Sequence, residues 1–151
     1  MSGLQHAKSF HDLMVYQKSR QLQREIFHLT KLFPREEVFS LTDQIRRSSR
    51  SVGANIAEAW AKRRYEKHFI SKLTDSNAEQ METQHWVETA LESGYIDTKT
   101  SVPLIEKCDE IGRMLNGMIE KADMFCGEPP RMLREDPAKY FTNSTLEDTD
   151  N

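Results

Sequence analysis

The chain reads LTDQIRRSSRSVGANIAEAW from residue 41 to residue 60, and this stretch decides the fold. Its apolar and small residues recur at steps of three and four, which places them on one side of an α-helix. They are Leu41, Ile45, Ser48, Val52, Ile56 and Ala59. Gly53 lies inside this helix, where a glycine costs about 1 kcal/mol relative to alanine. We therefore expect a neighbouring helix to pack closely at Gly53.

Three further segments show the same periodicity. The first runs from about residue 10 to residue 33 and ends before Pro34, because a proline disfavours a helical residue ahead of it. The next runs from about 65 to 93 and ends at Gly94, a residue type that readily takes the left-handed conformation of helix ends. The last begins near Pro103 and ends at about residue 125. Its seam residues are Leu104, Cys108, Ile111, Leu115, Met118, Ala122 and Phe125.

Two helix starts carry capping signals. Ser40 and Asp43 resemble a capping box for the 41–60 helix. Ser101 is a candidate N-cap for the last helix, close to Pro103.

The number and spacing of the helices predict the architecture. Short connections favour antiparallel neighbours, and seams that repeat near 3.5 residues are typical of left-handed coiled packing. The expected fold class is all-α, an antiparallel up-and-down four-helix bundle over residues 10–126. Residues 1–9 are expected to be a flexible N-terminus, and residues 127–151 a flexible, partly acidic tail.

Composition excludes several classes of protein. A length of 151 residues indicates one domain, and six glycines and five prolines argue against a turn-rich sandwich or barrel. No run of about 18 apolar residues is present, and the N-terminus lacks the apolar core of a secretion signal. Two cysteines without CxxC spacing indicate a reducing compartment. We expect a cytoplasmic protein that does not span a membrane.

Polar residues interrupt the seam of the 65–93 helix. Ser76, Gln80 and Gln84 lie on it, and Asn55 lies beside the stripe of the 41–60 helix. A buried amide costs a few kcal/mol unless it is hydrogen-bonded, so we expect these groups to pair with one another. A structural layer that sets helix register is favoured over a ligand site.

Several large apolar residues fall outside the seams. They are Phe27, Trp60, Met81, Trp86 and Met114. Because tryptophan and methionine are enriched at subunit interfaces, they indicate association between copies of the chain.

Charge is unevenly distributed along the chain. Residues 1–72 hold 14 Lys or Arg and 7 Asp or Glu, whereas residues 73–151 hold 7 and 17. The candidate nucleic-acid-binding residues are Arg46, Arg47, Arg50, Lys62, Arg63, Arg64 and Lys67. Phosphates bind fixed cations at such spacings, and Trp60 and Tyr65 could stack on unpaired bases. The pI of about 6.0 leaves an equal alternative, in which these cations pair with acidic helices of the same or a neighbouring subunit.

Two stretches resemble a known family. They are residues 10–60, with the blocks LTDQIRRS (41–48) and SVGANIAE (51–58), and residues 80–96. The chain is similar to the bacterial four-helix-bundle proteins encoded within 23S rRNA intervening sequences, and to the accessory subunit of diversity-generating retroelements. The matching positions are Arg46, Arg47, Asn55 and Glu58. The chain departs from the family pattern at Ala59, where glycine is frequent, and at Gln80, where glutamate is frequent.

The resemblance implies a bundle that assembles into a ring-like homopentamer with no assigned enzymatic activity. It also implies that basic surface binds RNA or DNA and that a reverse transcriptase is a potential partner protein. We expect a non-enzymatic homo-oligomer of this kind without a cofactor. A protein-binding adaptor without nucleic acid is the alternative.

A di-iron carboxylate bundle is a further, disfavoured alternative. Glu25-x-x-His28 and Glu82-x-x-His85 repeat the Glu-x-x-His spacing of such sites, with Glu58 and Glu110 as the remaining ligands. Because both histidines flank the seams, we favour surface roles and expect no metal site. Cys108 is expected in the core and Cys126 as an exposed thiol. No catalytic residues are assigned.

Overall fold

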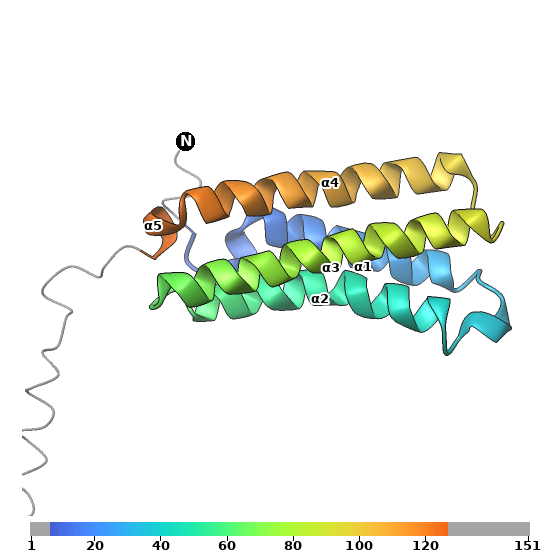
Figure 1. Ribbon diagram of the computed structural model, residues 1–151, viewed down its shortest axis with the longest axis horizontal. Helices are drawn as coiled ribbons and strands as arrows, with labels where there is room; N and C mark the ends of the chain where they lie inside the picture. Colours follow the sequence, from blue (N-terminus) through green and yellow to red (C-terminus); the bar gives the residue numbers. More distant parts are fainter. Residues whose placement is uncertain (1–6, 127–151) are drawn as a thin grey trace, which may run out of the picture.

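A computed structural model describes residues 7–126 (Figure 1). The expected tail, residues 127–151, and residues 1–6 lie outside the described residues. The long helices are α1 (Met14–Thr30), α2 (Leu41–Ala61), α3 (Glu66–Glu92) and α4 (Thr98–Glu120). Short helical turns are η1 (Phe10–Asp12), η2 (Arg35–Glu37) and α5 (Ala122–Phe125). All regular secondary structure in residues 7–126 is helical, which confirms the all-α class.

The four long helices form a closed ring of neighbours. Helix α1 packs on α2, α2 on α3, α3 on α4, and α4 returns to α1. The α1–α2 and α3–α4 connections lie at one end of the bundle, and the α2–α3 corner lies with α5 at the other (Figure 1). The up-and-down four-helix bundle is therefore confirmed. Among the described helices, none is long and apolar enough to cross a bilayer.

The buried positions of α2 agree with the predicted seam. All six of its predicted positions are buried. A Cβ atom added at Gly53 would lie 2.9 Å from Oγ of the fully buried Ser19 on α1. Helices α1 and α2 thus approach as closely as the glycine predicts.

The seam of α3 differs from the prediction in its C-terminal half. Thr83 and Ala90 are buried, whereas the predicted seam residue Gln84 is only half-buried. Helix α3 contacts both α2 and α4. The Thr83 hydroxyl lies 2.9 Å from the Ser48 hydroxyl of α2, so small residues occupy the close approach and Gln84 turns toward α4.

The first helix is shorter than its periodicity predicts. Leu13 is extended (φ −73°, ψ 128°), so α1 begins only at Met14. Ahead of it, Ser9 and Asp12 form a capping box that closes η1 as a separate turn. The local hydrogen bonds of these two side chains compete with a continuous helix.

Ser40 is the N-cap residue of α2 as predicted, but its side chain does not cap the helix and no capping box with Asp43 forms. The predicted cap of α4, Ser101, is wrong. Nearby carboxylates cap both helices instead. The Ser40 hydroxyl donates to Oε2 of Glu37 over 2.6 Å, and the backbone N–H of Leu41 donates to the same oxygen over 3.1 Å. In α4 the N-cap is Asp97, which accepts from the N–H of Thr100 over 3.0 Å. Gly94 has φ +77° and ends α3 as expected.

Candidate nucleic-acid interface

The seven predicted basic residues form two separate groups. Arg46, Arg47 and Arg50 lie in the first half of α2, whereas the other four lie at the α2–α3 corner. Twelve helical residues from Arg50 to Lys62 correspond to about 18 Å along the axis at 1.5 Å per residue. The two groups therefore face different ends of the bundle, and each has its own neighbours.

Arg47 is neutralised within the chain. Its Nη2 lies 2.7 Å from Oε2 of Glu82, and its Nη1 lies 3.9 Å from Oε1 of Glu79. Both carboxylates come from α3, so Arg47 joins α2 to α3. Glu79 is poorly solvated, since its Oε2 is buried without a hydrogen-bond partner in the described residues. Burial, and then the nearby Glu82, raise the pKa of the Glu79 carboxyl.

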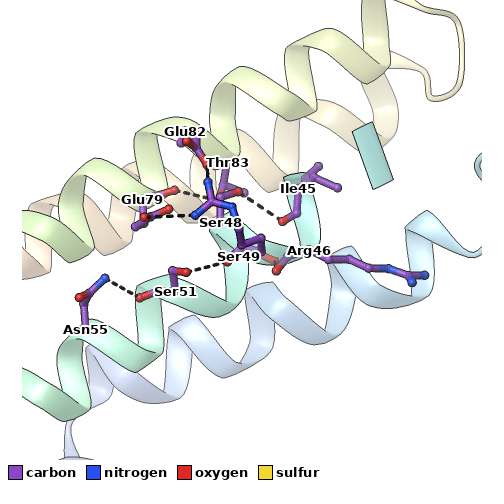
Figure 2. Close-up of polar contacts among 10 residues, drawn as sticks. Ile45, Arg46, Ser48, Ser49, Ser51, Asn55, Glu79, Glu82 and Thr83 are labelled. Atoms are coloured by element: carbon purple, nitrogen blue, oxygen red, sulfur yellow. Dashed lines mark hydrogen bonds and ion pairs between the residues drawn. The ribbon is translucent and has the colours of Figure 1, made fainter. Parts of the chain in front are cut away.

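Arg46 points the other way, toward α1. Its Nε donates to Oγ1 of Thr30 over 2.7 Å, and its Cζ lies 4.9 Å from the ring centroid of Phe27. Figure 2 shows the Arg46 side chain extending away from Glu79 and Glu82. Adjacent arginines in the sequence thus serve different helix pairs.

Two more cations share the ring of Phe27. Nζ of Lys31 lies 4.7 Å and Cζ of Arg50 lies 5.8 Å from its centroid. We call Lys31, Arg46 and Arg50 around this ring the Phe27 cation cluster. Cation–π contact contributes about 0.5–1 kcal/mol at exposed sites, which offsets part of the repulsion between the three charges.

The Phe27 cation cluster has no internal counter-charge. Within residues 7–126, no carboxylate oxygen lies within 4.0 Å of a charged nitrogen of Lys31, Arg46 or Arg50, unlike those of Arg47, Lys18, Lys72 and Lys107. An anion bound among the three would relieve their mutual repulsion. Sequence reasoning missed Lys31 and assigned Phe27 to a subunit interface. The available signal was that residues four apart share a helix face.

A groove of about 550 Å³ adjoins the Phe27 cation cluster at the start of α2. It is lined by Val38, Phe39, Thr42, Asp43, Arg46, Arg47, Arg50 and Ser51. Phe39 is 94% exposed, the most of the large apolar residues described. The Thr42 hydroxyl is buried and lacks a hydrogen-bond partner in the described part of the chain. The groove therefore combines positive charge with an exposed aromatic ring.

At the α2–α3 corner, Arg63 is tied to the protein. Its Cζ lies 3.6 Å from the ring centroid of Trp60, and its Nε donates to the Trp60 carbonyl over 2.9 Å. Desolvation lowers the pKa of this guanidinium. Trp60 packs against the core beneath it and does not offer a free face for a base. Lys62, Arg64 and Lys67 are exposed, so the corner is an open cationic surface.

The amides of α3 form a continuous chain of hydrogen bonds. Nε2 of Gln84 donates to Oε1 of Gln80 over 2.8 Å and to Oδ1 of Asp109 over 3.0 Å, while Nε2 of Gln80 donates to Oδ1 of Asn77 over 2.9 Å. The predicted pairing of the two glutamines is confirmed. It is wrong for Asn55, which donates to the carbonyl of Ser51 on its own helix (Figure 2). It is also wrong for Ser76, whose hydroxyl donates to the Val52 carbonyl of α2 over 2.8 Å. These mutual bonds favour a structural layer.

The apolar residues outside the seams do not form one exposed surface. Trp60, Trp86 and Met114 pack half-buried against the core, and only Met81 of the five is mostly exposed, at 57%. Leu32 and Phe39, at the end of the bundle that holds the α1–α2 connection, are exposed instead.

The residues of the di-iron alternative do not converge. Each proposed carboxylate faces its own cation: Glu25 with Lys107, Glu58 with Lys72, Glu82 with Arg47 and Glu110 with Lys18. His28 and His85 are exposed. In residues 7–126, no three His, Cys, Asp or Glu side chains lie close enough to share a metal ion.

The two cysteines are both sheltered. Cys108 is in the core as predicted, and burial raises the pKa of its thiol to about 12. Cys126 is half-buried, so its predicted exposure is wrong, and burial raises its pKa as well.

Comparison with known proteins places this bundle in a family. The family model described as 23S rRNA-intervening sequence protein matches residues 11–117. The chain belongs to the 23S rRNA-intervening sequence protein family. A similar solved structure is a Bacteroides thetaiotaomicron VPI-5482 protein of unknown function from the S23 ribosomal protein family. It is 31% identical with a TM-score of 0.65, over 71% of this chain and 99% of that one. No curated protein matches the chain.

The matched region of this intervening sequence protein contains every feature of the candidate interface. The Phe27 cation cluster, the groove and the α2–α3 corner all lie within residues 11–117. The bundle is thus the common framework on which these side chains are carried.

Proposed function

We propose that this intervening sequence protein is a non-enzymatic, cytoplasmic homo-oligomer, a pentamer, that binds RNA or DNA. Its principal contact is the Phe27 cation cluster. The observation that carries the proposal is that Lys31, Arg46 and Arg50 share one aromatic ring without a carboxylate partner in the described chain. Lys62, Arg64 and Lys67 at the α2–α3 corner supply a second group of exposed cations at the other end of the bundle.

The geometry of Arg46 suits phosphate binding. Its Nε bond to Thr30 and its contact with Phe27 hold the side chain, so little conformational entropy is lost when a ligand binds. A guanidinium fork binds phosphate oxygens bidentately, and each phosphate contact releases condensed counterions. We assign Arg47 to holding α2 on α3 because Glu79 and Glu82 already balance its charge.

Assembly would strengthen binding. Five copies multiply the positive field and give avidity without any new contact in each subunit. Exposed apolar side chains support association between copies, with Leu32 at 82% and Met81 at 57% exposure.

A protein-binding adaptor is the second candidate. The same exposed Leu32, together with Phe39, favours it, because large exposed apolar side chains often mark protein contacts. A reverse transcriptase would be one such partner.

The deciding experiment measures the affinity for a labelled RNA hairpin by fluorescence anisotropy between about 50 and 200 mM salt. Each phosphate contact should contribute roughly 0.9 to the slope of log affinity against log salt concentration. Arg46→Glu combined with Arg50→Glu should weaken binding about tenfold or more and reduce the salt slope by about 2. The matched control is Lys99→Glu with Arg113→Glu, two exposed cations of α4. Equal affinity of wild type and the first variant would refute the interface.

Light scattering tests the assembly separately. The expected solution mass is five times that of the 17.6 kDa chain. A single-chain mass would refute the oligomer. Recovery of one partner protein without nucleic acid from a pull-down would favour the adaptor.

A further inference from the structure

We propose that the groove beside the Phe27 cation cluster binds an unpaired nucleotide of a single strand, with its base stacked on Phe39 and its phosphates on Arg46 and Arg50. This inference rests on the proposed function and adds the substrate class, single-stranded rather than duplex nucleic acid. It follows from the exposed ring and the charges that surround it.

The first argument is the position of Phe39. A phenylalanine that is 94% exposed contributes almost nothing to the core, yet its ring lines the groove together with Arg46 and Arg50. The backbone that carries it is held on both sides: the N–H of Val38 donates to the Arg35 carbonyl over 3.2 Å, and that of Ser40 to the Glu37 carbonyl over 3.0 Å. The ring is therefore presented from an ordered turn.

The second argument is the charge of the groove. Three arginines and one aspartate line it, and the charge of Arg47 is balanced by Glu79 and Glu82. Arg46 and Arg50 remain for phosphate. Asp43 repels phosphate from its own side but accepts hydrogen bonds from the exocyclic amino groups of bases. This polarity orients a nucleotide with its backbone toward α1 and its base toward the start of α2.

Stacking selects for unpaired bases. In a duplex the faces of the bases are covered by their neighbours, so a ring on a protein surface cannot reach them without unstacking a step. A splayed single strand offers both its bases and its phosphates. An acidic peptide also complements the arginines, but its carboxylates do not stack on the flat face of Phe39.

The test compares a labelled, unstructured 12-nucleotide strand with a blunt duplex of equal length, using the full chain. We expect the strand to bind about tenfold more tightly than the duplex, as expected for one stacked base. Phe39→Ala should remove about that factor for the strand and leave duplex affinity within about twofold. Phe39→Trp should retain tight binding, and its added fluorescence should be quenched by the strand.

The matched control is Met14→Ala, which removes an apolar side chain of 64% exposure that does not line the groove. It should leave both affinities unchanged. Thermal melting should show that Phe39→Ala folds like wild type.

Three results would overturn the inference. Equal affinity for strand and duplex with no effect of Phe39→Ala would reject the stacking site and leave the proposed function intact. Failure to bind either probe would reject both. Displacement of the strand by polyglutamate of equal charge at the same concentration would show that the groove takes acidic chains without reading bases.

Discussion

The phenol of Tyr95 donates a 3.0 Å hydrogen bond to Oε1 of Glu37, across the end of the bundle. The other oxygen of the same carboxylate accepts from Ser40 and from the first backbone N–H of α2. One side chain thus joins the α1–α2 connection, the start of α2 and the α3–α4 connection. The turn that carries Phe39 is consequently fixed by a contact between residues 58 positions apart.

Glu37→Gln should lower the melting temperature at pH 7 by several degrees. The Ser40 hydroxyl, then the Leu41 N–H and then the Tyr95 phenol hold the pKa of Glu37 below its usual 4.5. Because the pKa is lower in the folded state, the stabilisation is present above pH 4.5 and is lost as the pH falls through the folded-state value. Thermal melts at pH 7 and pH 3 should show that the difference in melting temperature between wild type and Glu37→Gln is smaller at pH 3. Glu36→Gln, an exposed neighbour, serves as control.

Glu79→Gln should raise stability at neutral pH. Burial and Glu82 raise the pKa of Glu79, so the folded state binds its proton more tightly than the unfolded state does. The ionised carboxylate therefore costs stability at pH 7, and the cost disappears as the pH falls through the folded-state pKa toward 4.5. Urea unfolding should show a higher free energy of unfolding for Glu79→Gln than for wild type at pH 7, but not at pH 4.

Glu82→Gln is the matched comparison for Glu79→Gln. It removes the 2.7 Å partner of Arg47 and should cost up to about 1 kcal/mol, as expected for an exposed pair. A loss of stability in both variants at pH 7 would contradict the assignment of Glu79 as the destabilising member.

Gly53→Ala should destabilise the bundle by up to about 2 kcal/mol. The new Cβ would lie 2.9 Å from the Ser19 hydroxyl, which is buried and itself donates to the Tyr16 carbonyl. Overpacking costs about 1–3 kcal/mol, which exceeds the gain of about 1 kcal/mol in helix propensity. Gly117→Ala in α4 meets nothing within 4 Å and should stabilise by up to about 1 kcal/mol. Chemical denaturation compares the two, and a stable Gly53→Ala protein would disprove close α1–α2 packing.

Thiol labelling should distinguish the two cysteines. The thiolate is the reactive form, and a pKa of about 12 leaves Cys108 almost entirely protonated in the folded protein. A disulfide reagent at pH 8 should therefore label Cys126 first, and Cys108 only after denaturation. Cys126→Ser should abolish the early phase, whereas rapid labelling of that variant would show that the core opens readily.

The hydrophobic period was sufficient to predict four helices, their antiparallel order and the buried face of α2. An apolar face with three- and four-residue steps is buried by packing against the apolar faces of other helices. The same logic predicted the close approach at Gly53, because an unfavourable glycine inside a helix needs a packing reason.

The ends of the helices and the pairing of charged residues could not be predicted from the sequence. Glu37 caps α2 from a preceding turn, and Thr83 replaces Gln84 in the seam because α3 packs against two helices at once. The sequence determined the number and order of the helices and the buried face of α2, since these depend on neighbours a few residues apart. Only the tertiary structure decided that Arg47 is balanced by α3 while Arg46 and Arg50 meet Lys31 over Phe27, because charges are compensated by whichever helix lies beside them in space.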